Sequence, residues 1–286
     1  MPAILLFAAA GAFAQLVDGT LGMAFGVTST TLLVLLGATP VSASAAVHFA
    51  EIGTTLASGL SHWREGNVDR KVLWRLGIPG SLGAFIGATV LSRISLADAR
   101  VWMSALLFVL GLVLLLLFGL GTTLIPVISS RPKTNLLVPL GSFAGFVDST
   151  GGGGWGPITT PTLLTLTKTA PRRVVGTVSA SEFMVAASAS TGFIFGAVTD
   201  VEWDVVAGLL IGGVMMAPIA AKLAGRLPFA PFGAAIGGAV ILLNLRILLT
   251  EFGVATNVIW VVAISVVVAT VLLALRAYLR TDSNKS

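Results

Sequence analysis

The sequence predicts an all-α polytopic membrane protein made of two inverted-topology repeats. Only 10% of the 286 residues are charged, whereas soluble domains carry about 25%. Apolar runs of about 20 residues, long enough to cross a bilayer as helices, recur along the chain, whose mean hydropathy is +0.98. A glycine-rich segment also occurs twice. We expect each repeat to hold a broken or re-entrant hairpin with a glycine tip and three transmembrane helices, followed by one extra C-terminal helix.

Composition excludes several classes of function. The formal net charge of +5 does not indicate a nucleic-acid partner, because the basic residues lie in short loops where the positive-inside rule places them. Cysteine is absent, which excludes disulfides and thiolate metal sites. An intramembrane enzyme would need a nucleophile–base pair or a metal cluster, and both histidines lie in the first half of the chain. We therefore expect no catalytic activity, no cofactor and no metal.

The first half begins with an apolar run from Pro2 to Leu16, which segment 18–26 interrupts before a second leg, Val27 to Leu36. The sequence Ala12-Phe13-Ala14 resembles a signal-peptide cleavage site. No charged residue precedes Asp18, however, so the basic start of a signal peptide is missing. The three spans expected next are Val41–Ser61, Val72–Leu91 and Val101–Leu120.

The longest polar connection, residues 122–135, separates the two halves. In the second half, the hairpin legs are Leu136–Thr150 and Trp155–Leu166, and the spans are Arg172–Val198, Val205–Leu223, Phe229–Leu249 and Val258–Leu279. The chain is thus divided into a first repeat (1–121), a cytoplasmic linker (122–135), a second repeat (136–250) and an additional C-terminal helix with its tail (251–286).

The two glycine-rich segments belong to an internal repeat. With an offset of 130, Val17, Asp18, Thr20, Gly22, Gly26, Thr30 and Leu33 match Val147, Asp148, Thr150, Gly152, Gly156, Thr160 and Leu163. After one inserted residue, Pro40, Val47, Glu51, Asp69 and Gly77 match Pro171, Val178, Glu182, Asp200 and Gly208. Apolar matches carry little information in a chain this hydrophobic, but the matched Asp, Glu, Pro and Gly residues do.

Charges in the loops orient the repeats. Arg276, Arg280 and Lys285 place the C-terminus in the cytoplasm. Counting spans back from there puts the acidic loop Asp200–Asp204 outside, whereas its repeat equivalent, the basic loop Arg64–Lys71, belongs inside. The halves therefore point in opposite directions, as in transporters with inverted repeats.

The length of the hairpin legs favours re-entrant hairpins. Each leg of ~14 residues would be roughly 21 Å long, which is too short to cross about 30 Å of hydrocarbon. An alternative, in which each hairpin forms two tilted spans, keeps the same orientation of the loops.

The glycine run Gly151–Gly154 does not favour a helix, since glycine costs roughly 1 kcal/mol per helical position. Free N–H groups at such a tip, with hydroxyls nearby, are suited to binding an anion, although glycines also allow close helix packing. No lysine or arginine lies deep in a span, so backbone and hydroxyl groups would hold the anion. The candidate substrate-binding residues are Thr20, Gly22, Gly26, Ser29, Thr30, Thr150, Gly151, Gly152, Gly153, Gly154, Trp155, Thr159 and Thr160.

Buried acids are the candidates for coupling and gating. Glu51 and Glu182 each lie about ten residues into a span, roughly 15 Å deep, and intramembrane carboxylates indicate function by default. Each glutamate either binds a proton, which would stop it repelling the anion, or accepts N–H bonds that hold a hairpin. For Asp18 and Asp148, helix capping is favoured over contact with a coupling ion. His48 precedes Glu51 by three residues and either pairs with it or only satisfies it.

The motif Phe146-Val147-Asp148-x-x-Gly151-Gly152-Gly153-Gly154-x-Gly156-Pro157, with its weaker first copy, resembles the sulfite exporter TauE/SafE permeases. The resemblance covers the chain from about Leu6 to Leu249. It implies a bacterial inner-membrane permease for small sulfur-containing anions such as sulfite, sulfoacetate or related organosulfonates. The family's glycine motif maps onto Gly151–Gly156. The first copy departs from the motif, because Leu21, Met23 and Ala24 replace glycines.

These observations together predict a secondary transporter of a small sulfur-containing anion, with export expected and protons as a coupling ion. The alternatives are a passive anion channel or facilitator with the same site, and a permease for a small carboxylate. The expected partners are the anion, the lipid bilayer and protons, with no nucleic acid, and a homo-oligomer is left open. The expected location is the inner membrane, crossed several times.

Overall fold

The computed structural model describes residues 2–121, 134–167, 169–224 and 230–283, and the described residues form eleven helices without a strand. The first half contains α1 (Pro2–Leu21), α2 (Phe25–Leu35), α3 (Pro40–Arg64), α4 (Arg70–Leu91) and α5 (Leu96–Leu120). The second contains α6 (Thr134–Gly151), α7 (Trp155–Leu166), α8 (Pro171–Phe195), α9 (Trp203–Leu223) and α10 (Ala230–Glu251), and α11 (Thr256–Ser283) follows. The prediction of an all-α polytopic protein is confirmed, and the predicted linker lies mostly outside the described residues.

Local sequence signals start the long helices of the first half. Thr39 caps α3 by accepting a hydrogen bond from the backbone N–H of Ser42 at 3.1 Å, and proline follows at the first helical position. Asp69 caps α4 through the N–H groups of Lys71 and Val72. These caps fix where each helix leaves the loop, so they also fix the register of the polar side chains along α3.

The two legs of each hairpin differ more in length than the sequence predicted. The first legs, α1 with 20 residues and α6 with 18, are longer than the predicted ~14, because the helices continue past Asp18 and Asp148 to the glycines. The second legs, α2 with 11 residues and α7 with 12, are shorter. At 1.5 Å per residue α1 is about 30 Å long, so the argument that both legs are too short to cross the membrane is wrong for α1.

Six of the described helices are long and apolar enough to span a membrane, and they are α1, α5, α8, α9, α10 and α11. The sequence predicted seven spans, counting α3 and α4 but not α1. Buried polar side chains lower the hydropathy of α3, and Arg70, Lys71 and Arg75 lower that of α4. Because α3 packs between α8 and α9, its polar residues face protein instead of lipid.

The helices of the two halves pack against each other in matching pairs. Helix α1 packs along α9, where Gly212 lies against Ala8 and Gly19 against Ala220, and α4 packs along α6 in the corresponding way. Both pairs run parallel. At the centre, α3 and α8 cross in antiparallel directions, with Gly59 against Ala180 and Gly176 against His62.

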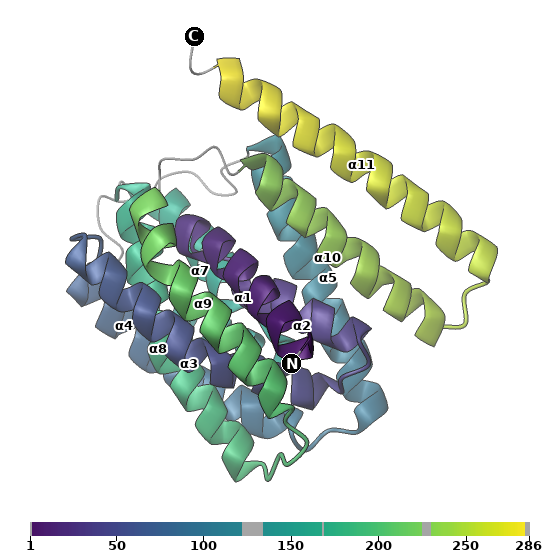
Figure 1. Ribbon diagram of the computed structural model, residues 1–286, viewed down its shortest axis with the longest axis horizontal. Coiled ribbons are helices and arrows are strands. Elements are labelled where there is room, and N and C mark those ends of the chain that lie inside the picture. The colour runs from purple at the N-terminus through teal and green to yellow at the C-terminus, as the bar shows by residue number, and fades with distance from the viewer. Residues whose placement is uncertain (1, 122–133, 168, 225–229, 284–286) are drawn as a thin grey trace.

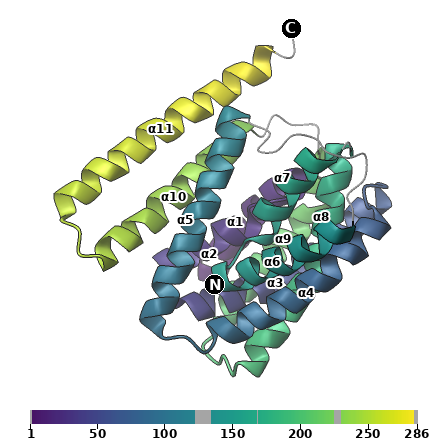
Figure 2. The same cartoon turned by 180° about the vertical axis from the view of Figure 1, so that it is seen from behind.

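Helices α5, α10 and α11 form a layer beside this central bundle (Figure 1; Figure 2). An ion pair of 3.2 Å between Arg100 and Glu251 joins the start of α5 to the end of α10, so these helices are antiparallel. Helix α11 packs mainly on α10, and no residue of its apolar window is buried. Arg280 near its end donates a hydrogen bond of 2.6 Å to the carbonyl oxygen of Leu120, which places the ends of α5 and α11 on the same side.

Candidate functional site

Each first leg ends at a glycine in the left-handed region of backbone space. Gly22 has φ +71° and Gly152 has φ +72°, a conformation that glycine adopts without steric cost. The N–H groups of Gly152 and Gly153 both donate to the carbonyl oxygen of Asp148, at 2.6 and 3.0 Å. This ending satisfies the last turn of α6 and turns the chain back toward α7.

The carboxylate of Asp148 then caps the second leg of its own hairpin. Its Oδ1 atom accepts hydrogen bonds from the backbone N–H groups of Gly154 at 2.7 Å and Trp155 at 2.9 Å. Asp18 has the same relation to the backbone N–H of Phe25 at the start of α2. Two of the N–H groups that the sequence predicted to bind an anion therefore donate hydrogen bonds to a carboxylate of the protein itself.

The two tips contact each other across the centre of the bundle. A Cβ atom added to Gly26 would lie 2.6 Å from the Cα of Gly153, and one added to Gly156 would lie 2.6 Å from the Cα of Met23. Thr160 donates a hydrogen bond of 2.6 Å to the carbonyl oxygen of Gly22. Thr30 donates the reciprocal bond to the carbonyl oxygen of Gly152. These two bonds, which we call the tip latch, close each hairpin on the other.

The remaining hydroxyl candidates face mostly into their own helices. Thr20, Thr150 and Thr159 donate to backbone carbonyl oxygens within the preceding turn. The exception is Ser29, whose Oγ atom is buried without a hydrogen-bond partner among the described residues. It lies in the second turn of α2, one residue after Thr28, whose Oγ1 atom is also buried without a hydrogen-bond partner among the described residues.

Two other candidates from the glycine run serve packing in this conformation. Gly151 lies against Leu106 of α5, with an added Cβ 3.3 Å from that side chain. Trp155 is fully buried, and its indole N–H donates to the carbonyl oxygen of Val178 in α8 at 3.3 Å. The indole therefore fixes α7 against α8.

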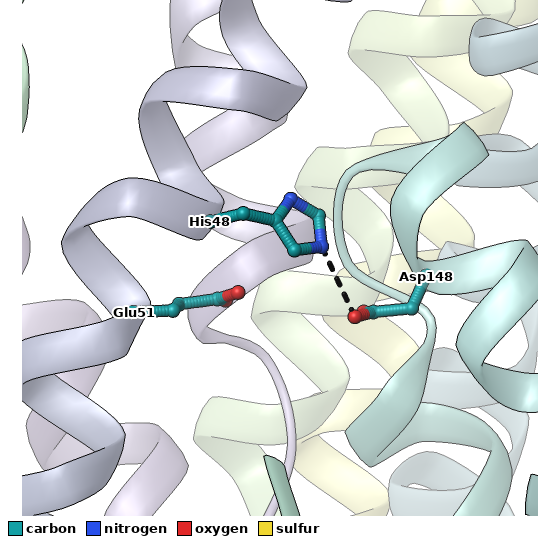
Figure 3. Close-up of side chains that lie close together, drawn as sticks. All are labelled: His48, Glu51 and Asp148. Carbon is teal, nitrogen blue, oxygen red and sulfur yellow. Dashed lines mark hydrogen bonds and ion pairs between the residues drawn. The ribbon is translucent and has the colours of Figure 1, made fainter. Parts of the chain in front are cut away.

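His48 pairs with Asp148. One of the two alternatives predicted from the sequence was a pair with Glu51. Its Nε2 atom lies 3.1 Å from Oδ2 of Asp148, and its Nδ1 atom lies 2.7 Å from the carbonyl oxygen of Ser44 (Figure 3). The carboxylate of Glu51 points into the same space from the next turn of α3. The three donor atoms lie within 4.8 Å of one another, so among the described residues these side chains could hold a metal ion.

Four carboxyl groups and one imidazole share this buried region. Asp18, Glu51, Asp148 and Glu182 lie close enough to act electrostatically on one another, and His48 is the basic group among them. All are at least 94% buried. If all four acids were ionised, the net charge would be −3 with His48 protonated or −4 with His48 neutral, and such a charge at membrane depth is very costly. The region must therefore take up protons or a cation.

A line of polar side chains along α3 connects this region to both hairpins. The residues recur every three or four positions, which places them on one helical face, and we call them the α3 polar stripe: Ser44, His48, Glu51, Thr55, Ser58 and His62. Ser44 donates to the carbonyl oxygen of Ser149 at 2.7 Å, and His62 bonds that of Gly19 at 3.1 Å. Ser44, Thr55, Ser58 and His62 were not predicted as site residues, although their helical spacing is visible in the sequence.

Comparison with known proteins identifies a family of membrane transporters. The family model described as sulfite exporter TauE/SafE matches residues 7–247 of the chain. A protein of Bacillus subtilis (strain 168), "Probable membrane transporter protein YtnM", is 46% identical over 259 residues, which cover 88% of this chain and 85% of that protein. No solved structure matches the chain significantly.

Proposed function

Because the chain belongs to the sulfite exporter TauE/SafE family, and is thus a membrane transporter, we propose that it exports a small sulfur-containing anion across the bacterial inner membrane. Sulfite or an organosulfonate has the required size and charge. The observation that carries the proposal is the carboxylate of Asp148 bound by the N–H groups of Gly154 and Trp155. A site that holds a carboxylate in this way suits a small oxyanion.

The substrate replaces the Asp148 carboxylate at these N–H groups when the tips separate. The freed Oδ1 position lies at the start of α7, where the helix dipole favours negative charge. The tip latch must open first, because Thr30 bonds the carbonyl oxygen of Gly152 beside the site. Ser29 then supplies a hydroxyl from the other hairpin.

A proton in the His48–Asp148 pair couples to this exchange. The carbonyl oxygen of Ser44 can only accept, so Nδ1 of His48 carries a hydrogen. The bond between Nε2 and Asp148 then needs a second hydrogen, held by either the imidazole or the carboxyl group. When an anion displaces Asp148, a hydrogen on the Asp148 carboxyl group prevents its repulsion of the anion. Binding of the anion is therefore linked to the protonation of this pair, and Glu51 and Glu182 are the neighbouring acids that exchange the proton.

The two halves act as inverted repeats in this scheme. The antiparallel crossing of α3 and α8, and of α5 and α10, supports opposite orientations for residues 1–121 and 136–250. The segment 251–286 adds α11 outside the repeats. The C-terminus is cytoplasmic, supported by the basic residues Arg276 and Arg280 and by the Arg280 contact with the end of α5.

The test is flux of radiolabelled sulfite by purified protein in liposomes, with and without an imposed pH gradient. We expect the flux to follow the pH gradient and to be insensitive to a sodium gradient. Flux that responds to neither gradient would indicate a facilitator. Flux that follows the sodium gradient would indicate that the buried acids bind a metal cation. Absence of sulfite and organosulfonate flux, with flux of a small carboxylate, would contradict the assigned substrate class.

A further inference from the structure

A cavity of about 520 Å³ opens where the loop between α3 and α4 meets the start of α8. Its charged lining contains four basic residues and one acid, and these are Arg70, Lys71, Arg75, Arg173 and Asp69. The cavity is distinct from the tip region, because none of the described residues that line it belongs to either hairpin tip. Val68, Val72, Leu137 and Thr169 complete the lining.

The positive charge of this cavity is not neutralised from within. The acid, Asp69, uses its Oδ1 atom to cap α4. Arg70 stacks over the ring of Trp63, 4.4 Å from the ring centroid. In the part of the chain that the structure describes, no ion pair involves Lys71, Arg75 or Arg173. Three exposed cations in a concave surface attract anions and raise their local concentration.

The α3 polar stripe leads from this cavity to the hairpin tips. Gly176, one turn after Arg173, lies against Asn67 and His62, and the backbone N–H of Asp69 bonds the hydroxyl of Thr177 at 2.8 Å. His62 therefore packs against the same turn of α8 as the loop that contributes Val68 and Asp69 to the cavity. Within the described residues, Nδ1 of His62 and Oγ of Ser58 are buried without hydrogen-bond partners. Such unsatisfied groups suit a path that is at times filled by water or a polar cargo.

The equivalent position at the other end of the bundle has the opposite character. By the repeat offset, Asp69 and Lys71 correspond to Asp200 and Glu202, and Arg173 corresponds to Ser42. Valines, Val201 and Val206, replace Arg70 and Arg75. The hydroxyl of Ser42 is bonded to the carbonyl oxygen of Asp200. One end of the bundle thus attracts an anion, and the other repels it.

We propose that the basic cavity is an oxyanion-capture site that collects the cargo before it moves along α3 to the tips. The choice of a sulfur oxyanion as cargo rests on the proposed function, but the capture of an oxyanion by this cavity does not. Because the cavity lies on the side of the C-terminus, capture there and repulsion at the acidic end favour export. The phosphate of an anionic lipid has the same chemistry, so the test separates the two sources.

The experiment compares the full chain with the double variant Arg75→Gln/Arg173→Gln in nanodiscs of phosphatidylcholine, with sulfite and sulfate binding measured by calorimetry. We expect the double variant to bind sulfite about tenfold more weakly, from the loss of local concentration. The matched control is Arg172→Gln, which removes an exposed arginine beside Arg173 that does not line the cavity. It should bind like the unaltered protein.

Flux in liposomes then separates the capture site from the transport function. The double variant should show a raised KM for sulfite, an unchanged maximal rate and a weaker dependence on ionic strength. Unchanged binding and KM would overturn the proposal. A second result would also overturn it. If KM is unchanged, and native mass spectrometry shows that the unaltered protein retains a phosphatidylglycerol molecule which the double variant loses, the cavity is a lipid site. Sulfate binding lost in the double variant, without sulfite flux in any variant, would support the cavity and contradict the proposed cargo.

Discussion

Helices α3 and α8 occupy equivalent places in the two halves, yet their facing side chains differ. Both helices are central, and each carries a buried glutamate, Glu51 or Glu182. Where α3 has His48, α8 has Ser179, whose hydroxyl has no partner among the described residues. Where α3 has His62 in its last turn, α8 has Phe193. Repetition of the scaffold has therefore duplicated the acids but not the bases.

The hairpins, by contrast, are nearly symmetric. Each tip has a glycine at φ near +71°, an aspartate that caps the second leg, and a threonine that bonds the opposite tip. In the proposed scheme the two hairpins act as a symmetric gate, and α3 contributes the imidazole that links this gate to a proton. The following experiments break or sharpen this comparison.

The largest effect is expected from Gly152→Leu in the gate. The side chain would meet Thr30, and the backbone would be held at φ +72°. Left-handed backbone costs a residue with a Cβ atom roughly 1–2 kcal/mol, and overpacking adds about 1–3 kcal/mol. Sulfite binding and flux should be abolished. Flux equal to that of the unaltered protein would contradict an anion site at the tips.

The variant Gly253→Leu separates the two effects of Gly152→Leu, which are backbone strain and the clash with Thr30. Gly253 has φ +69° in an open loop, with no atom near an added Cβ. This variant carries the same backbone cost without the clash, so it should lose some thermal stability while its flux per folded molecule is retained.

His48→Ser gives α3 the residue that α8 carries at the equivalent position, Ser179. It removes the imidazole that shares a hydrogen with Asp148, so sulfite flux should no longer follow a pH gradient, and passive flux should remain. Ser179→His is the reciprocal variant, and it should leave the coupling unchanged because α3 still carries its own imidazole. Coupling that survives His48→Ser would move the proton site to the glutamates.

Glu51→Gln and Glu182→Gln test whether the duplicated acids share one role. Glu51 lies beside the His48–Asp148 pair, and Glu182 faces Asp18 without an imidazole. Glu51→Gln should therefore flatten the pH dependence of flux measured from about pH 5 to 8, and Glu182→Gln should keep most of it. Loss of pH dependence in Glu182→Gln alone would reverse the assignment of the proton to α3.

The smallest effects are expected in the tip latch. Thr30→Val and Thr160→Val each remove one hydroxyl that bonds a carbonyl oxygen of the opposite tip, and each should cost about 1 kcal/mol. The two losses should be equal, as measured by thermal unfolding in detergent. Markedly unequal losses would show that the gate is as asymmetric as the central helices.

The sequence predicted the helices well, because apolar runs, caps and glycines act locally. It placed the ends of most helices within a few residues and identified Asp148 as a cap. It did not predict the bonds of Thr30 and Thr160 to the opposite tips, since each bond joins residues more than 120 positions apart. It also did not place Asp148 beside His48, because Glu51 is near His48 in sequence whereas Asp148 is brought near only by folding.

The low hydropathy of α3 has a consequence for how the protein is made. A helix that carries Glu51, His48 and His62 does not partition readily into lipid on its own, since a central charge costs about 3 kcal/mol on insertion scales. The helices that shield it, α8 and α9, are synthesised only after the first half has left the ribosome. We therefore expect the α3 polar stripe of the nascent first half to remain shielded from lipid, for example within the translocon, until α8 and α9 have been synthesised. A chain that stops after α5 should accordingly be degraded, and co-expression of the missing half should rescue it.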